Sequence, residues 1–246
     1  MAEGSVASIA VGNPAISILK RTPVLNSLSG GTQQRLREVL RPIELADDAI
    51  LFRDEAPVDA CYLVEEGALK VSIDDFTGGE TWLAILGAGD WVGELGIIDR
   101  QPRSATVAAM TKCRLWKLTV RDFDTLRRED FELYERLVEL ICARLRATNR
   151  QVCNQRLGLE ARLAQTMLKL AKAFGEPMPD GRTIIRYRIG QSRLAEVAGA
   201  SRENVNRQFR AWREAGLCER VQAYYCLRDL SEWELLGGHY PPTITG

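Results

Sequence analysis

The pattern of apolar residues changes along the chain, and this change restricts the folds that the chain can adopt. From Ile43 to Leu118 the sequence consists of short apolar runs, such as Cys61–Val64 and Trp82–Leu86, separated by turn-forming residues. Many short strands joined by glycine-rich turns predict a β sandwich or a jelly roll. The apolar spacing is helical over Pro14–Leu40 and again from Asp122 onward. The sequence therefore predicts an α+β protein in which a β domain lies between helical segments.

The charge is distributed unevenly along the chain. The 33 basic and 33 acidic residues cancel over the whole length of 246 residues. Nine arginines and four glutamates lie between Arg182 and Arg220, so this segment carries +5 and the remainder −5. A basic segment inside a neutral chain is the electrostatic footprint of nucleic-acid binding. We therefore predict double-stranded DNA as the partner of the C-terminal part.

Length and composition restrict the class of protein. A chain of this length with 46% hydrophobic residues can bury the cores of two domains. Its six cysteines are scattered without Cys-x-x-Cys pairs, which predicts reduced thiols and a cytoplasmic protein. No apolar run reaches membrane-spanning length and no signal sequence is recognisable, so we expect no membrane contact. With His239 as the single histidine and no nucleotide-hydrolase or zinc-protease motif, we expect no enzyme activity.

The stretch from Gly93 to Val107 combines two features of a nucleotide site. Glycines on both sides of Glu94 and Leu95 let the backbone turn tightly and approach a ligand, with N–H groups free to bind an anion. Glu94 can accept hydrogen bonds from a pair of sugar hydroxyls. Arg103 can bind a phosphate with its planar fork of donors, and the Ser104 hydroxyl lies beside it. The stretch thus predicts a small nucleotide with one phosphate; the alternative is a glycine-rich β corner with a surface arginine.

A heptad pattern follows in the central helical segment. Apolar or small residues recur there at spacings of three and four, namely Val138, Ile141, Leu145, Thr148 and Val152. This is the a/d spacing of a helix that packs along its length against a partner helix. The spacing predicts a seam with a partner helix or, as the alternative, packing of this face on the chain's own core, and the polar Thr148 at a seam position favours the seam of a homodimer.

The segment from Ser192 to Arg213 predicts a helix-turn-helix. Ser192 can cap a short first helix, Gly199 can form the tight turn, and Ser201 can cap the second helix. The inner face of that second helix carries apolar residues at i, i+4 and i+7, namely Val205, Phe209 and Trp212. Gln208 occupies a position that is often apolar in such motifs.

The outward face of the second helix is polar and charged. Its members are Arg202, Glu203, Asn206, Arg207 and Arg210. Arginine can pair with the two major-groove acceptors of guanine, and glutamate can accept from the cytosine amino group. A charged helix face is more often simply solvated, but the glycine turn, the caps and the basic segment favour DNA recognition here. Leu217–Leu227 then predicts a wing hairpin, and Ser231-x-x-Glu234 a capping box for a last helix.

Over roughly Leu51 to Leu230, these motifs resemble the cyclic-AMP receptor protein family of bacterial transcription regulators. The resemblance implies an N-terminal β jelly-roll cyclic-nucleotide-binding domain, a long dimerisation helix and a C-terminal winged helix-turn-helix domain. The corresponding domains are residues 12–156, with the dimerisation helix at about 131–156, and residues 157–236. The implied effector is cAMP, with cGMP as a second candidate. We expect no metal or haem, since no cysteine precedes Cys61 and the only histidine lies in the tail.

The resemblance also assigns roles to residues of the nucleotide site. In the family, the residue matching Glu94 holds the ribose hydroxyl, and those matching Arg103 and Ser104 hold the cyclic phosphate. The residue matching Thr148 touches the base, and its neighbour, here Asn149, reaches the ligand held by the other subunit. The best-known relatives have serine there, whereas a carboxamide both donates and accepts. We therefore expect modest base discrimination, with cAMP favoured.

The segment Ser201–Arg207 closely resembles the recognition helix of the family. Residues matching Arg202, Glu203 and Arg207 recognise a TGTGA-like half-site there, which implies palindromic DNA sites, and the family further implies RNA polymerase as a partner. Glu55 departs from the family, because relatives usually have a turn glycine at this position. The alternative function is a cyclic-nucleotide-binding module that regulates a protein partner; the helix-turn-helix is the feature that distinguishes the two.

Overall fold

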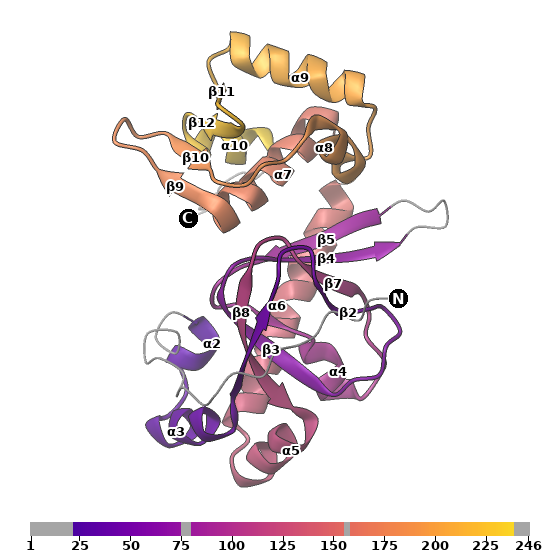
Figure 1. Cartoon of the computed structure of the whole chain (residues 1–246), viewed down its shortest axis with the longest axis vertical. Coiled ribbons are helices and arrows are strands. Elements are labelled where there is room, and N and C mark those ends of the chain that lie inside the picture. The colour runs from indigo at the N-terminus through magenta and orange to yellow at the C-terminus, as the bar shows by residue number, and fades with distance from the viewer. Residues whose placement is uncertain (1–21, 75–79, 155–157, 239–246) are drawn as a thin grey trace, which may run out of the picture. The chain divides into compact units, whose positions relative to one another are not determined.

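The computed structural model describes residues 22–74, 80–154 and 158–238 (Figure 1). The chain divides into two compact units, the first built from the residues up to Ile73 and from Trp82 to Thr148, the second mainly from Asn149 onward. The predicted domain boundary between residues 156 and 157 lies outside the described residues and stays a prediction. Among the described residues, no helix is long and apolar enough to cross a membrane.

The β domain is made of two antiparallel sheets. Its strands are β1 (Arg41–Leu45), β2 (Ile50–Phe52), β3 (Ala60–Glu66), β4 (Leu69–Asp74), β5 (Glu80–Leu86), β6 (Trp91–Val92), β7 (Thr106–Ala109) and β8 (Cys113–Thr119). The strand orders are β1-β8-β3-β6 and β2-β7-β4-β5. The longest pairing joins β3 to β8, with Ala60 opposite Thr119 and Glu66 opposite Arg114. These sheets confirm the β domain that the short apolar runs predict.

The first sheet is buried on both of its faces. Successive side chains of a strand point to opposite faces, and in β3 Tyr62 and Val64 face the second sheet whereas Cys61 and Leu63 face a cluster covered by helices. The same alternation holds in β8, where Leu115 belongs to one core and Trp116 to the other. Burial on both faces explains the continuous apolar run Ala60–Val64 in β3.

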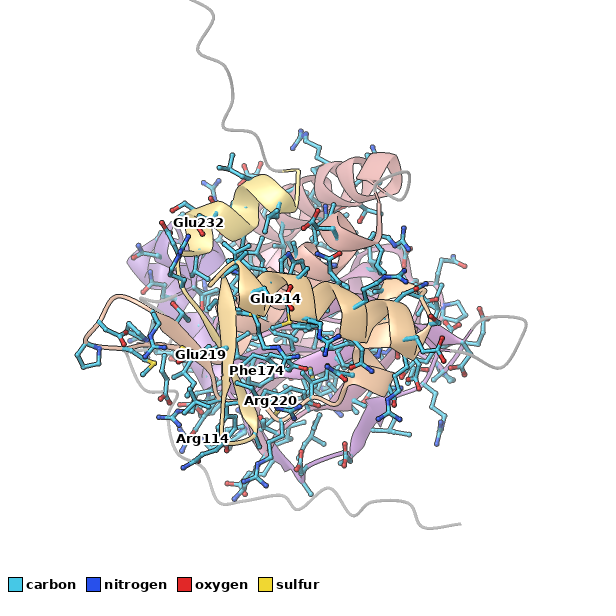
Figure 2. All side chains as sticks on the ribbon, turned by 90° about the horizontal axis from the view of Figure 1, so that it is seen from above. Arg114, Phe174, Glu214, Glu219, Arg220 and Glu232 are labelled. Atoms are coloured by element: carbon cyan, nitrogen blue, oxygen red, sulfur yellow. The ribbon has the colours of Figure 1, made fainter. Side chains whose placement is uncertain are left out.

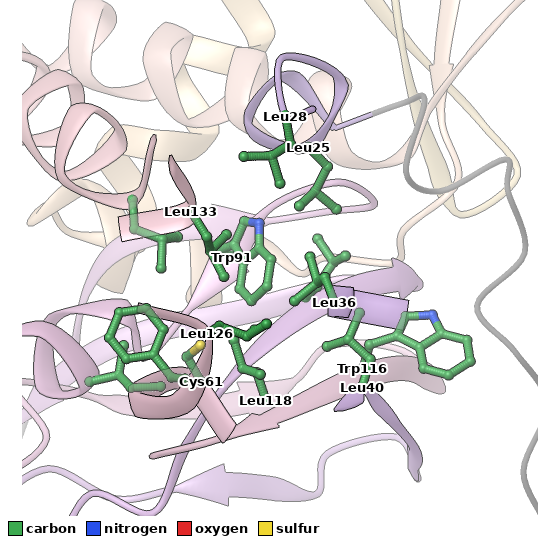
Figure 3. Close-up of a cluster of buried hydrophobic side chains, with 14 residues drawn as sticks. Leu25, Leu28, Leu36, Leu40, Cys61, Trp91, Trp116, Leu118, Leu126 and Leu133 are labelled. Atoms are coloured by element: carbon green, nitrogen blue, oxygen red, sulfur yellow. The ribbon is translucent and has the colours of Figure 1, made fainter. Parts of the chain in front are cut away.

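Helices cover the second face of this sheet. They are α2 (Pro23–Asn26), α3 (Gly30–Val39), α5 (Val120–Glu129) and α6 (Glu132–Asn154), and the short α4 (Glu94–Asp99) follows β6. Figure 3 shows their shared core, in which Leu36 of α3 and Leu133 of α6 lie near Trp91 of β6. Ser29 caps α3, since its hydroxyl accepts from the Thr32 N–H, and its own backbone N–H donates to Glu132. The N-terminal helices are thereby held on the start of α6.

The second unit is a helix-turn-helix with a small sheet. Its elements are α7 (Leu159–Phe174), β9 (Gly175–Pro177), β10 (Thr183–Ile185), α8 (Gln191–Ala198), α9 (Arg202–Glu214), β11 (Cys218–Val221), β12 (Tyr224–Leu227) and α10 (Leu230–Leu236). The sheet order is β11-β12-β10-β9. Figure 2 shows Glu214 at the end of α9 and Arg220 on the wing strand β11. Trp212 of α9 packs edge-on against Trp233 of α10, with ring centroids 4.6 Å apart. The predicted helix-turn-helix and wing are confirmed.

Two of the predicted helix caps are wrong. The N-cap of α8 is Gly190, whose carbonyl accepts from the Leu194 N–H, so Ser192 lies inside the first turn. The N-cap of α10 is Asp229, whose carboxylate accepts from both the backbone N–H and the hydroxyl of Ser231. In both cases the helix begins one residue before the serine, and its N-cap lies two residues before the serine.

The turn at Glu55 forms without the glycine that relatives usually have. Glu55 has φ +62°, the left-handed conformation that non-glycine residues adopt at a cost of about 1–2 kcal/mol. Two contacts hold it there, because its backbone N–H donates to the Arg103 carbonyl at 2.8 Å and to the Asp54 carboxylate at 3.1 Å. The turn at Glu55 therefore holds the backbone of Arg103 in place.

Candidate nucleotide site and DNA-binding helix

Gly93 lies against both predicted ligand-binding side chains, because it precedes Glu94 and contacts Arg103. It is the N-cap of α4 with φ +77°, a conformation that favours glycine. A Cβ atom at Gly93 would lie 2.4 Å from Nη1 of Arg103, so a larger residue would also displace the arginine. The sequence thus brings Arg103 against the turn that begins α4, although ten residues separate the two.

Glu94 is buried and already holds a charged partner. It is the first residue of α4 and is 4% exposed. Its Oε1 accepts from Nη1 of Arg144 at 2.6 Å, and Nη2 of the same guanidinium donates to the Trp91 carbonyl at 2.7 Å. The fork of Arg144 therefore connects α6 to the predicted ribose-binding carboxylate. Sequence reasoning missed Arg144, although it lies one helical turn before Thr148 on α6.

Arg103 is enclosed by acceptors and an aromatic ring. It is 3% exposed, and it donates to the carbonyls of Ala60 at 2.7 Å and Gly93 at 3.3 Å and to Asp59 at 3.1 Å. Its guanidinium lies over the Phe52 ring at 4.0 Å. Within the described residues, its buried Nε–H has no hydrogen-bond partner. A buried donor without an acceptor is costly, and a phosphate oxygen is the kind of group that would satisfy it.

Asp59 is a second residue that sequence reasoning missed. Its carboxylate accepts from Arg103 through Oδ1 and from Lys117 through Oδ2, the latter at 2.6 Å. Burial acts to raise the pKa of Asp59, but the hydrogen bond and charge of Lys117 and the charge of Arg103 outweigh it and lower the pKa. Asp59 therefore stays ionised and balances the charge of Arg103. No local pattern marks it, since 44 residues separate it from Arg103.

The other predicted ligand residues are exposed. Ser104 follows Arg103 directly, and Leu95 is on the open side of α4 with 41% of its surface exposed. Thr148 and Asn149 are both exposed on α6. These residues are exposed, whereas Glu94 and Arg103, the other two members of the predicted site, are buried.

A cavity of about 310 Å³ lies beside this region but does not coincide with it. Its lining comprises Glu55, Pro57, Val58, Arg100, Gln101, Pro102 and Val120. None of the predicted ligand residues lines it. Within the described part of the chain, no group of three or more His, Cys, Asp or Glu side chains could hold a metal ion.

The predicted seam residues of α6 lie on a different face from its core residues. Leu133 and Leu137 are buried in the cluster of Figure 3. Val138 and Ile141 are half-buried, and Leu145 is 59% exposed. The side chain of Val152 lies outside the described residues. The stripe is therefore not part of the core of its own domain.

The recognition helix α9 has the predicted division between buried and exposed faces. Ser201 caps it by accepting from the Asn204 N–H at 3.2 Å, and Gly199 ends α8 in the left-handed conformation. The buried face carries Val205, Phe209 and Trp212. The predicted DNA contacts are all exposed, namely Ser201, Arg202, Glu203, Asn206, Arg207 and Arg210. One of them, Arg207, is braced by a hydrogen bond to the Asn204 side chain at 2.8 Å.

Known protein families match both parts of this chain. A model of the cyclic nucleotide-binding domain matches residues 42–130, and a model of the Crp-like helix-turn-helix domain matches residues 161–233. The cAMP-activated global transcriptional regulator CRP of Salmonella typhimurium is 33% identical over 160 residues, which cover 64% of this chain and 75% of that protein. A CRP-like cAMP-activated global transcriptional regulator of Mycobacterium tuberculosis is 29% identical over 194 residues, which cover 77% and 85%.

A solved structure shows the same fold. The c-di-GMP responsive global regulator CLP of Xanthomonas campestris has a TM-score of 0.66 at 23% identity, covering 81% of this chain and 99% of that chain. The relatives are transcription regulators and not enzymes, and the two matched models include the Gly93–Arg103 region and the whole of α9. This chain therefore belongs to the cyclic-AMP receptor protein family of transcription regulators.

Proposed function

We propose that this regulator is a homodimer that binds cAMP and, with cAMP bound, recognises palindromic DNA with TGTGA-like half-sites. The observation that carries this proposal is the arrangement around Gly93. There the Gly93 carbonyl accepts from Arg103, and the next residue, Glu94, is bonded to α6 through Arg144. The arginine that would bind the phosphate and the carboxylate that would bind the ribose thus lie at one turn, and the carboxylate is bonded to the helix that would form the dimer seam.

The ligand would be held from two sides. The free Nε–H of Arg103 and the Ser104 hydroxyl would bind the cyclic phosphate, and Glu94, with the backbone at Gly93 and Leu95, would bind the ribose. Thr148 and Asn149, both exposed on α6, would contact the base. The Asn149 carboxamide can donate and accept, so cGMP is a second ligand, bound less tightly than cAMP.

Exposure of the seam supports the homodimer. Leu145 exposes most of its side chain, and Val138 and Ile141 are only half-buried. Apolar residues in heptad positions that the chain's own core does not bury are the usual sign of a coiled-coil partner. A second copy of α6, with Val152 continuing the stripe, would bury them and would bring two recognition helices into one complex.

The DNA site would be the exposed face of α9. Arg202, Glu203 and Arg207 would recognise bases in the major groove, whereas Ser201, Asn206 and Arg210 would contact bases or phosphates. Two such helices related by a two-fold axis require half-sites about one helical turn apart, on the order of 34 Å. RNA polymerase is the proposed protein partner and the cytoplasm the proposed location, as expected for a transcription regulator of this family.

Calorimetry and a DNA-binding assay together test this function. Titration of the purified chain with cAMP and cGMP should show saturable binding of cAMP and weaker binding of cGMP. A mobility shift on a TGTGA-type palindrome should become stronger when cAMP is added. Absence of binding to either nucleotide would contradict the ligand assignment, and DNA binding that is indifferent to the nucleotide would contradict the coupling.

A further inference from the structure

The first turn of α7 holds both helices of the helix-turn-helix. Arg162 donates from Nε to the Ala198 carbonyl at the end of α8, at 2.9 Å. Glu160 accepts two hydrogen bonds from α9 at its Oε1, from Nε2 of Gln208 at 2.9 Å and from Nε1 of Trp212 at 3.0 Å. Two residues of one helical turn therefore contact both helices that present the DNA-binding face.

The hydrogen bond from Trp212 to Glu160 starts from a buried aromatic side chain of α9. Trp212 is 2% exposed, and its ring packs edge-on against Trp233 at 4.6 Å and Phe209 at 5.2 Å. A buried indole N–H needs an acceptor, and a carboxylate oxygen makes the stronger, charge-assisted kind of hydrogen bond. Glu160 supplies this acceptor at one fixed point on the circumference of α9.

The same carboxylate explains why residue 208 is polar. Gln208 is half-buried at a position that is often apolar, and its amide donates to the oxygen that also accepts from Trp212. Two donors, one turn apart on α9, converge on one oxygen of α7. A pair of bonds to a common acceptor restricts rotation of the helix about its axis more than apolar packing alone, since packing has no fixed direction.

Rotation of α9 decides where its base contacts point. Trp212 and Arg207 are five residues apart and thus about 140° apart around the helix, so the Trp212 side faces the core when the Arg207 side faces outward. A small rotation of α9 about its axis turns the guanidinium of Arg207 around that axis by the same angle. Recognition of a guanine edge by two hydrogen bonds tolerates little displacement.

We propose that Glu160 is a positioning residue for base recognition. Its carboxylate sets the rotation of α9 through Gln208 and Trp212, and thereby sets where Arg202 and Arg207 meet the bases. This inference rests on the proposed DNA-reading role of α9. Glu160 acts through the helix and touches no base.

The test compares Glu160→Ala with Glu160→Gln in the full chain with cAMP present. The measured quantity is the ratio of affinities for the palindrome and for a scrambled duplex at one salt concentration. Loss of a charge-assisted bond should lower the palindrome affinity of Glu160→Ala about tenfold and leave the scrambled affinity within about twofold. Glu160→Gln keeps an acceptor oxygen and should restore the ratio. Glu214→Ala, which removes an exposed charge from the end of α9, is the matched control (Figure 2).

A spectroscopic measurement follows the bond itself. In a ¹⁵N-labelled chain the indole signal of Trp212 is identified by its loss in Trp212→Phe, and Glu160→Ala should shift it whereas Glu214→Ala should not. An unshifted signal, or an unchanged affinity ratio in Glu160→Ala, would overturn the inference. A lower thermal midpoint with an unchanged ratio would show a purely structural role and also overturn it. If Glu160→Ala does not fold, Trp212→Phe is measured instead. The inference then requires that Trp212→Phe lower the ratio of palindrome affinity to scrambled affinity.

The two proposals fail in different ways. If the wild-type chain does not distinguish the palindrome from scrambled DNA, the proposed function is wrong and the inference falls with it. If the wild type distinguishes them and Glu160→Ala does so equally well, only the inference is wrong.

Discussion

Arg103 carries the charge on which the proposed nucleotide site depends, and Arg103→Gln removes that charge while it keeps a polar side chain. The cyclic phosphate would lose its buried cationic partner. A hydrogen bond that involves a charged group contributes about 1.5–3 kcal/mol, and the fork of an arginine makes two. The expected loss of at least about 3 kcal/mol corresponds to roughly a 150-fold weaker affinity for cAMP.

The structure also sets the expected cost in stability. Arg103 donates to the buried Ala60 carbonyl at 2.7 Å, and loss of this partner costs about 1–3 kcal/mol. Asp59 loses one partner as well, but its side chain is 58% exposed and keeps Lys117. The bond to Gly93, at 3.3 Å, is long and contributes less. A loss of this size leaves a domain of ordinary stability folded.

Calorimetry with cAMP and urea denaturation separate loss of binding from loss of fold. Arg103→Gln should bind at least two orders of magnitude more weakly and unfold in one cooperative transition at a lower midpoint. Arg114→Gln is the control, because it removes an arginine that is half-exposed on β8 and should leave the affinity unchanged. A folded Arg103→Gln variant whose dissociation constant is within threefold of the wild type would refute the assignment of the phosphate site.

Four further predictions follow from the described contacts. Glu55→Gly removes left-handed strain and should raise the free energy of unfolding by about 0.5–1 kcal/mol in urea titrations. Leu145→Asp should leave the fold intact, since Leu145 is 59% exposed in the single chain, and should sediment as a monomer where the wild type sediments as the proposed dimer. Arg207→Ala should weaken palindrome binding by about 1–3 kcal/mol and relax selection at one guanine, seen with single-base variants of the site. The pKa of Asp59 is lowered on folding, so its contribution to stability is present above its ordinary value of 3.8 and is lost as the pH falls through the lower folded value. The free energy of unfolding of Asp59→Asn should therefore fall less steeply than that of the wild type as the pH is lowered into the acid range.

Local patterns in the sequence predict many elements of both units. The helical spacing from Asp122 onward includes α7 (Leu159–Phe174), and Ser201 caps α9 as expected. Such features depend on residues within one or two turns of each other. The predicted cap at Ser192 is wrong because the helix begins earlier, with Gly190 as an N-cap that makes no side-chain hydrogen bond.

The partners of the site residues could not be predicted, because they are distant in the chain. Arg144 and Glu94 are 50 residues apart, and Glu160 and Trp212 are 52 apart. Neither pair forms a motif, and each depends on how two separate elements pack. The spacing of Thr148 from Arg144, one helical turn, is the one local signal that could have led to the Glu94 contact.

In the proposed function, ligand binding at the nucleotide site changes the affinity of α9 for DNA. Glu94, the proposed partner of the ribose, already accepts a hydrogen bond from Arg144 of α6, so a ligand there would alter the surroundings of that contact. In chain order α7 comes next, and its first turn fixes both α8 and α9 through Arg162 and Glu160. Because coupling free energies are reciprocal, palindromic DNA should tighten cAMP binding by the same factor by which cAMP tightens DNA binding. Titration with cAMP in the presence and absence of the palindrome gives the first factor, and titration with the palindrome in the presence and absence of cAMP gives the second. Unequal factors would show that a further equilibrium, such as dimer dissociation, takes part.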